Sequence, residues 1–145
     1  MSISSVHIIN GPNLNLLGVR EPDVYGHTSF EDYFLKLKGD FPNIHLSHAQ
    51  TNHEGQIIDW LHDLGFESNV GIVLNAGGYT HTSIAIRDAI ASIENPVVEV
   101  HISAVSERED FRKVNFLKGV CKHSIEGAGL EGYALAIDWL LNLPD

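Results

Sequence analysis

The stretch SSVHIINGPNLNLLG, residues 4–18, decides whether this chain of 145 residues can form a dinucleotide-binding Rossmann domain. Ser4–Asn10 is predicted to form the first strand, and residues 10–18 form the turn behind it. This turn has no GxGxxG motif, and Pro12 lacks the backbone N–H that a dinucleotide pyrophosphate would use. The turn therefore argues against a Rossmann domain that binds nicotinamide or flavin dinucleotides, and the sequence has no P-loop either.

Strand-like and helical segments alternate along the whole chain. Four further strands are predicted at Ile44–Gln50, Val70–Ala76, Pro96–Ser103 and Gly119–Ile125. Apolar residues at helical spacing mark helices over 30–37, 57–64, 86–93 and 130–141. Thr28 with Glu31 predicts the start of the first helix, and Ser106 with Glu109 predicts a shorter one. This alternation predicts an α/β fold in one domain, residues 1–145: a flavodoxin-like three-layer sandwich whose five-stranded parallel sheet has the order 2-1-3-4-5, with helices on both faces.

Composition and charge narrow the range of partners. The chain is 43% apolar, carries a net charge of −10 and has no cluster of Lys and Arg. Nucleic-acid binding rests on neutralising phosphates, so it is not expected. No apolar run approaches the roughly 18 residues of a membrane span, and the N-terminus lacks the basic segment of a signal peptide. Cys121 is the single cysteine and can form no internal disulfide, which favours a cytoplasmic location.

The sheet order predicts where a ligand binds. Open α/β sheets bind ligands beyond the carboxyl ends of the strands, where the strand order reverses. In the order 2-1-3-4-5 that point lies between strands 1 and 3. The most unusual segments lie at the ends of strands 1, 3 and 4: NGPNLNLLGVREPDVYG, NAGGYTHTS and EVHIS. We therefore expect a site at this edge of the sheet.

The fourth strand carries polar residues where a buried parallel strand is normally apolar throughout. Glu99 and His101 are two residues apart, so they share a face, and Glu99 can bond one imidazole nitrogen and orient the other. A catalytic acid or base is one interpretation, and a buried pair without a catalytic task is the other. Ser103 favours the first, because the helix predicted behind it would offer free N–H groups to an anion.

The segment after strand 3 also has two interpretations. Asn75 ends the strand, and Gly77 lets a ligand approach the backbone closely. Taken alone, the loop is typical of a glycine turn before a helix capped by Thr80 or Thr82, with His81 exposed.

Two arginines are also expected near this edge of the sheet, whereas metal-binding motifs are absent from the sequence. Arg108 and Arg112 are four residues apart on the predicted short helix, where one could reach a ligand or pair with Glu109. The sequence has no HExxH, HxH or Cys/His cluster, so no metal is predicted.

The loop GVREPDVYG, residues 18–26, places Arg20 and Tyr25 five residues apart. A tyrosine has an ordinary pKa of about 10, too high for a base at neutral pH, and a nearby guanidinium lowers that pKa. Alone, such a pair is more typical of a surface contact. Opposed to an oriented His101, it supplies the base of an acid–base pair that can eliminate water from a β-hydroxy ketone without a cofactor.

Five motifs, in this order and spacing, resemble the type II 3-dehydroquinate dehydratases: INGPNLNLLGVREPDVYG, TNHEGQIIDWLH, NAGGYTHTSIAIRDAI, VEVHIS and REDFR. The resemblance covers nearly the whole chain. It implies a flavodoxin-like subunit, assembled as a homododecamer of trimers, that converts 3-dehydroquinate to 3-dehydroshikimate in the shikimate pathway. It further implies an anti elimination through an enolate, with no metal, Schiff base or other cofactor.

The resemblance also implies a role for individual residues. Tyr25 would remove the C2 proton, and Arg20 would keep Tyr25 ionised. His101 would protonate the departing C1 hydroxyl, with Glu99 as its orienting partner. Asn13 would steady the enolate through a water. The implied substrate-binding positions are Asn75, Gly77, His81 and Arg112 around the ring, Ile102 and Ser103 at the carboxylate, and Asp88 reaching into a neighbouring subunit's site.

The chain departs from the family pattern beside the carboxylate site and within NAGGYTHTS, where relatives more often carry NPGAYTHTS, and one alternative function stays open. Ala104 and Ser106, beside the carboxylate site, stand where relatives commonly carry Asn and often His, so substrate affinity could differ. The alternative is a non-catalytic flavodoxin-like module, either nucleotide-binding or receiver-type. A receiver needs acidic residues where this chain has Asn10 and Asn75, and a flavin module would be yellow.

Overall fold

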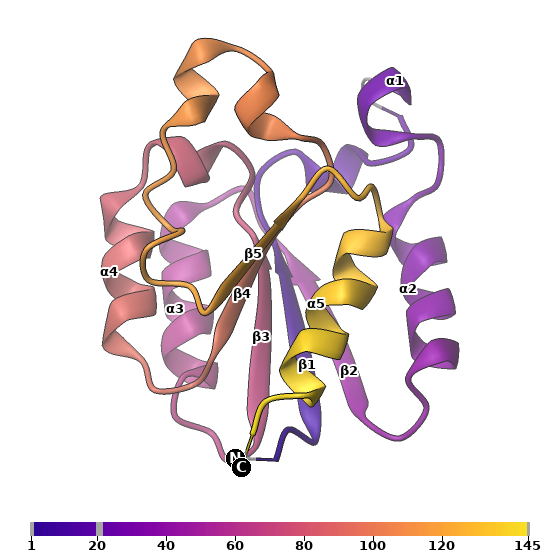
Figure 1. Cartoon of the computed structure of the whole chain (residues 1–145), viewed down its shortest axis with the longest axis vertical. Coiled ribbons are helices and arrows are strands. Elements are labelled where there is room, and N and C mark those ends of the chain that lie inside the picture. The colour runs from indigo at the N-terminus through magenta and orange to yellow at the C-terminus, as the bar shows by residue number, and fades with distance from the viewer. Residues whose placement is uncertain (1, 20–21, 145) are drawn as a thin grey trace.

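A computed structural model describes residues 2–19 and 22–144, with only the backbone described at residues 24 and 25. Its centre is a parallel sheet of five strands: β1 (Ser5–Asn10), β2 (His45–Gln50), β3 (Val70–Asn75), β4 (Val97–His101) and β5 (His123–Glu126) (Figure 1). The strand order is β2-β1-β3-β4-β5, with every neighbouring pair parallel. The predicted fold class and strand order are confirmed.

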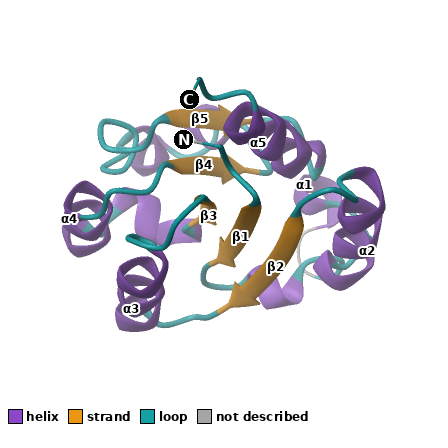
Figure 2. Cartoon of the chain, turned by 90° about the horizontal axis from the view of Figure 1, so that it is seen from below, coloured by secondary structure: helices purple, strands orange, loops and turns teal. Residues whose placement is uncertain are grey.

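Helices cover both faces of this sheet. Figure 2 shows α3 (Glu54–Leu64) and α4 (Ile84–Ser92) on one face, and α2 (Phe30–Asp40) and α5 (Glu131–Leu141) on the other. The short helix α1 (Pro22–Tyr25) and four 3-10 turns complete the fold: η1 (Leu14–Leu16), η2 (Gly77–His81), η3 (Val105–Glu107) and η4 (Asp110–Lys113). None of the helices that the structure describes is both long and apolar enough to cross a membrane.

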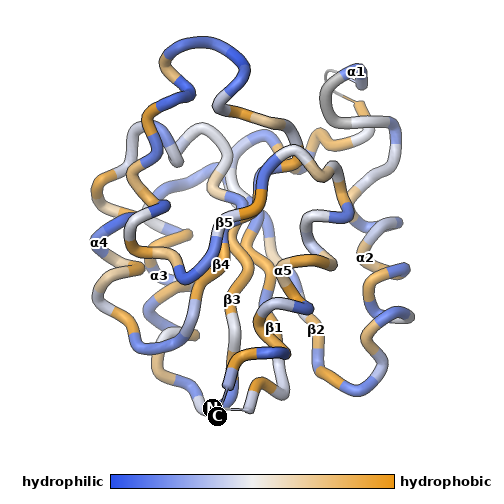
Figure 3. Tube along the Cα trace, viewed as in Figure 1, coloured by the Kyte–Doolittle hydropathy of each residue, from blue (hydrophilic) through white to orange (hydrophobic). Residues whose placement is uncertain are grey.

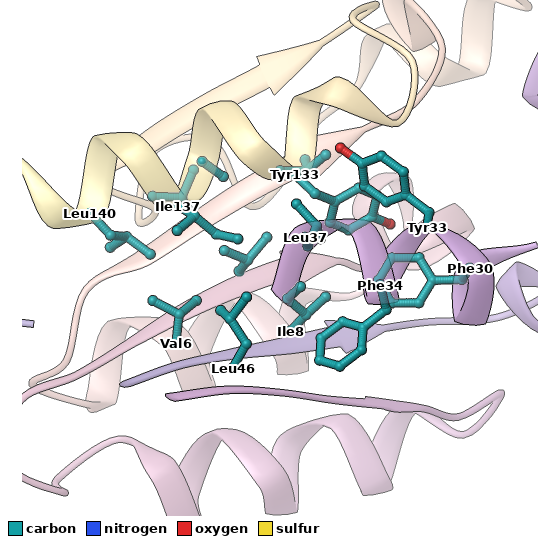
Figure 4. Close-up of a cluster of buried hydrophobic side chains, with 14 of the residues drawn as sticks. Val6, Ile8, Phe30, Tyr33, Phe34, Leu37, Leu46, Tyr133, Ile137 and Leu140 are labelled. Carbon is teal, nitrogen blue, oxygen red and sulfur yellow. The ribbon is translucent and has the colours of Figure 1, made fainter. Parts of the chain in front are cut away.

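Alternating side chains of the strands fill two apolar layers. Val6 and Ile8 of β1 pack with Tyr133 under α2 and α5, whereas Ile9 packs under α3 and α4. Figure 4 shows the first of these layers, and in Figure 3 hydrophobic residues dominate the central strands β3 and β4. The helices expose their polar sides, so each helix is held by the apolar stripe predicted from its spacing.

Two helix caps differ from the prediction by a few residues. Ser29, rather than Thr28, caps α2, and its Oγ accepts a hydrogen bond of 3.2 Å from the backbone N–H of Asp32. Ser83 caps α4 by accepting from the N–H of Ile86 at 2.9 Å. Neighbouring hydroxyl residues are equally suited to capping, and the one that immediately precedes the first helical residue takes the role.

The short helix predicted from Ser106 and Glu109 is wrong. The segment forms the two turns η3 and η4, and the Ser106 hydroxyl donates to Glu126 at 2.5 Å instead of capping a helix. Phe111 is 62% exposed, so the segment buries no apolar stripe that would stabilise an α-helix.

The fifth strand begins four residues later than predicted, at His123. The N–H groups of Val120 and Cys121 both donate to the carbonyl of Leu117, which makes a turn of the residues assigned to the start of the strand. Leu117 itself is fully buried. Apolar Val120 and Cys121 therefore pack beside a turn, although in sequence they resemble the start of a strand.

Candidate active site

A pocket lies beyond the carboxyl ends of β1, β3 and β4, at the point where the strand order reverses. The space between its walls, part of it open solvent, amounts to about 540 Å³. Eight of the predicted site residues line it: Asn13, Asn75, Gly77, His81, His101, Ile102, Ser103 and Arg112. Arg108 lines it as well. The structure thus brings together segments that are about ninety residues apart in the sequence.

Glu99 and His101 form a buried pair at the end of β4. His101 Nε2 lies 2.9 Å from Glu99 Oε2, and the two side chains are 5% and 1% exposed. Burial by itself would raise the pKa of Glu99, but hydrogen bonds from His101, Ser124 and Asn115 outweigh it and hold that pKa below its ordinary value. A charged carboxylate therefore holds one imidazole nitrogen of a histidine that lines the pocket.

Asn75 is held from beneath by a tyrosine of α5. The fully buried Tyr133 hydroxyl donates to Asn10 Oδ1 at 2.7 Å and accepts from Asn75 Nδ2 at 3.0 Å. Burial raises the pKa of Tyr133, so its hydroxyl stays protonated. Asn75 Oδ1 accepts in turn from the N–H of Gly77 at 3.2 Å. These bonds fix which end of the Asn75 amide is the donor, and one N–H of Nδ2 is left for a ligand.

We expect Tyr133→Phe to destabilise the protein, because it leaves Asn10 and Asn75 with unpaired buried polar atoms. The expected loss is about 1–3 kcal/mol of unfolding free energy, measured by urea denaturation. Tyr33→Phe is the matched control, since the Tyr33 hydroxyl is buried without a hydrogen-bond partner in the described part of the chain. Equal unfolding midpoints for the two variants would contradict this account.

His81 is 9% exposed, so the exposed position expected from its loop alone is wrong. Its Nδ1 lies 2.6 Å from the carbonyl oxygen of Val114, which can only accept, so Nδ1 carries the hydrogen. The second nitrogen, Nε2, is then an acceptor when the ring is neutral. A histidine held this way can accept a hydrogen bond from a hydroxyl group in the pocket.

Asn13 occupies a left-handed backbone conformation, with φ of 71°. Its N–H donates to Asn52 Oδ1 at 3.0 Å, and Gln50 Nε2 donates to the same oxygen at 3.0 Å. Asn and Asp adopt this conformation more readily than other non-glycine residues. Asn52 thus fixes the turn that carries Asn13, a role that the motif around it did not reveal.

The anion-binding helix predicted behind Ser103 is wrong, because η3 is a single 3-10 turn without a side-chain cap. The guanidinium of Arg108 lies beside Ser103 instead, with Nη1 3.4 Å from Ser103 Oγ. Arg112 lines the pocket, and its Nε bonds Glu109 Oε2 at 2.5 Å, so the ion pair with Glu109 is confirmed and ligand contact stays a prediction. Two guanidinium groups therefore border the pocket, and that of Arg108 lies near Ser103.

Four of the predicted residues are not among those that line this pocket, and one of them, Glu99, lies behind His101 as its bonding partner. Asp88 lies on the exposed side of α4, with Oδ1 2.9 Å from Nη1 of Arg87. Arg20 lies outside the described residues. Tyr25 is the last residue of α1, which Figure 1 shows at the same end of the sheet as the pocket, and its side chain is not described. Gly18 and Gly26, at the two ends of this loop, have positive φ angles of 91° and 81°.

The fold and the pocket together define a class: a flavodoxin-like α/β protein with a small-molecule site suited to acid–base chemistry. The groups that suit it are the buried carboxylate–histidine pair, the two arginines and the oriented amides, which meet where the strand order reverses. Residues 4–141 match the model of the family "Dehydroquinase class II", and the chain belongs to that family. The family resemblance noted in the sequence is confirmed.

Proteins of known name match this chain over almost their full lengths. The chain is 54% identical over 135 residues to a 3-dehydroquinate dehydratase of Exiguobacterium sp., covering 92% of each chain. It is 47% identical to a 3-dehydroquinate dehydratase of Rhodopseudomonas palustris strain HaA2, covering 92% of this chain and 89% of that one. The type II dehydroquinase of Butyrivibrio crossotus matches with a TM-score of 0.89 and 46% identity, covering 95% and 97% of the two chains.

Proposed function

We propose that this protein is a 3-dehydroquinate dehydratase, a hydro-lyase that removes water from 3-dehydroquinate to give 3-dehydroshikimate in the shikimate pathway. The observation that carries the proposal is the buried Glu99–His101 pair, whose histidine lines a pocket at the point where the strand order reverses, in a chain of the class II dehydroquinase family. The substrate is a β-hydroxy ketone, so its own carbonyl can hold the charge that develops during elimination.

Tyr25 is proposed as the base of the first step. Its phenolate takes the proton from C2, and the electrons of that C–H bond move toward the ketone to form an enolate. Arg20, five residues earlier, stabilises the phenolate by its positive charge. Asn13, which lines the pocket, steadies the enolate oxygen through a water.

His101 is proposed as the acid of the second step. The enolate collapses to form the C1–C2 double bond, and the C1 hydroxyl leaves as water with a proton from the imidazolium. The carboxylate of Glu99, 2.9 Å from Nε2, stabilises the positive charge that His101 must carry before it donates. The proton that Tyr25 has gained then returns through solvent to His101, which restores the starting state.

The remaining pocket residues are proposed to orient the substrate. The Nδ2 of Asn75, the Nε2 of His81 and the guanidinium of Arg112 would contact the ring hydroxyls, and Gly77 allows the backbone to approach the ring. The backbone of Ile102 and the hydroxyl of Ser103 would bind the carboxylate. Arg108, within reach of Ser103 Oγ, adds a positive charge at that end of the pocket.

We further propose a homododecamer of trimers in which Asp88 completes a neighbouring site. Ile84, four residues before Asp88 on α4, is 57% exposed, and the Asp88 side chain is 64% exposed. Residues four apart share a helix face, so Asp88 and an apolar side chain both point outward from α4. The dodecamer would elute from a sizing column at twelve times the 16.0 kDa of the chain. The cytoplasmic location stays a prediction.

Subunit mixing tests the shared site. Asp88→Ala and His101→Ala chains are each expected to be nearly inactive, because every site lacks one group. In mixed oligomers formed at equal amounts, about one quarter of the sites combine an intact His101 with an intact neighbouring Asp88. We expect activity to recover toward that fraction after unfolding and refolding the mixture, and no recovery would contradict a shared site.

The activity itself is tested by the ultraviolet absorbance of the conjugated enone that forms from 3-dehydroquinate. The wild-type protein, treated with a chelator and given no cofactor, is expected to produce this signal. A folded wild-type protein that produces none would contradict the proposed function. Activity that requires an added metal would contradict the metal-free mechanism.

A further inference from the structure

Glu99 is held by more than the histidine that it orients. Its Oε2 faces His101, while its Oε1 accepts from Ser124 Oγ at 2.5 Å and from Asn115 Nδ2 at 3.0 Å. The carboxylate is 1% exposed, so water contributes little to stabilising its charge. A buried carboxylate keeps its charge only where hydrogen-bond donors replace the lost water.

Both donors are themselves fixed by the fold. Ser124 is the register partner of Glu99 across β4 and β5, so the two side chains lie side by side on one face of the sheet. The Oδ1 of Asn115 accepts from the N–H groups of Leu117 and Lys118 at 2.8 and 3.0 Å. With Oδ1 engaged by two donors, the amide can only turn its Nδ2 toward Glu99.

We propose that Asn115 and Ser124 are positioning residues, which hold Glu99 as a charged carboxylate with Oε2 aimed at His101. The proposal rests on the dehydratase function proposed above. Neither residue is among those that line the pocket, and they act on the acid step through Glu99. They occupy Oε1 and so leave Oε2 to the imidazole.

The charged surroundings of Glu99 support this assignment. The ionisable groups that face it among the described residues are His101 on its own strand and Cys121 in the turn before β5. Burial, and then the charge of Glu99, raises the pKa of the Cys121 thiol, so the thiol stays neutral. The pKa of Glu99 is lowered despite its burial, and both Ser124 and Asn115 contribute to that direction.

Asn115→Asp is the sharpest variant. It keeps the oxygen that accepts from Leu117 and Lys118, but it replaces the donor to Glu99 by a second carboxylate. A carboxylate at this half-buried position, next to the buried Glu99, disfavours the charged form of both groups, so one of them retains a proton near neutral pH. We expect kcat to fall roughly 10- to 100-fold with KM changed less than about twofold, and the acid limb of the pH–rate profile to rise by about one pH unit or more.

Ser124 provides a milder variant with its own rescue. Ser124→Ala removes one donor and is expected to lower kcat roughly 10-fold, whereas Ser124→Thr keeps the hydroxyl and should stay within about twofold of wild type. Ser47→Ala is the matched control, because Ser47 also bonds a side chain on a neighbouring strand, His7 at 2.5 Å, but at the opposite edge of the sheet. We expect Ser47→Ala to leave kcat and the pH–rate profile unchanged.

A titration of the Glu99 carboxyl carbon by NMR tests the inference without turnover. Its signal is assigned by its disappearance in Glu99→Gln. We expect it to titrate below the ordinary range of a glutamate in the wild-type protein and above that range in Asn115→Asp. Identical Glu99 titrations in the two proteins, or a pH–rate profile that neither variant shifts, would overturn the inference. A wild-type protein without dehydratase activity would instead refute the proposed function, and the titration would still decide the role of Asn115. If Asn115→Asp does not fold, the comparison of Ser124→Ala with Ser124→Thr decides it.

Discussion

Tyr25→Phe is expected to abolish turnover while leaving the fold intact. The variant loses the phenolate that takes the C2 proton, and phenylalanine has no group that can replace it. Removal of a general base lowers kcat by about 10²–10⁴-fold or more, measured here by enone absorbance at saturating 3-dehydroquinate. Because only the hydroxyl is removed, the affinity for substrate should change little.

Tyr33→Phe is the natural control for this variant. It removes the same hydroxyl from a tyrosine that is 5% exposed on α2 and does not line the pocket, and we expect wild-type kcat. A Tyr25→Phe protein that kept near wild-type turnover would refute the tyrosinate mechanism. Loss of both secondary structure and activity would be a folding effect, so circular dichroism of each variant accompanies the assay.

His101→Ala is expected to cause the second large loss, again about 10²–10⁴-fold in kcat. The C1 hydroxyl is a poor leaving group without a proton donor, and alanine supplies none. The substitution also leaves Glu99 buried without the partner of its Oε2, so a smaller loss of stability should accompany the loss of rate. Rates are measured with substrate well above KM, so that weaker binding does not enter the comparison.

Glu99→Gln separates the effect of the Glu99 charge from the effect of its hydrogen bond with His101. Glutamine keeps the shape of the side chain and can still accept a hydrogen bond from His101, but it carries no charge to stabilise the imidazolium. We expect a loss in kcat that is clearly smaller than that of His101→Ala. Equal activity of Glu99→Gln and wild type would show that the carboxylate has no part in the acid step.

The fold could be predicted from the sequence because the spacing of apolar residues is regular and repeats along the chain. Each strand and each long helix carries its own apolar period, and the parallel sheet and strand order follow from their alternation. The position of the site followed from the same pattern, since polar residues such as Glu99 and His101 interrupt a strand that is otherwise apolar. The pocket confirms that the ends of β1, β3 and β4 meet.

The errors concern segments whose structure depends on contacts made elsewhere. Ser106 was expected to cap a helix, but Glu126 on β5 offers its hydroxyl a carboxylate, and Phe111 finds no core to enter. His81 was expected on the surface from its loop alone. Its burial depends on Val114, 33 residues later in the chain.

The supporting residues of the site could not be found from local patterns. Ser124 is 25 residues from Glu99, and Tyr133 is 58 residues from Asn75, and each bond exists only because two elements lie side by side in the folded chain. A serine on a short strand and a tyrosine on an apolar helix stripe have ordinary local explanations. Their roles appear once the register of β4 with β5 and the packing of α5 are known.

The division of labour between Tyr25 and His101 is the central claim, and exchange of the substrate C2 proton tests it most directly. In deuterated water, NMR follows deuterium entering C2 of 3-dehydroquinate while absorbance follows the loss of water. The account predicts that His101→Ala still exchanges the C2 proton without dehydration, because the base is intact and the enolate is reprotonated. Tyr25→Phe should lose both exchange and dehydration. Exchange that persists in Tyr25→Phe but vanishes in His101→Ala would contradict the assignment of base and acid.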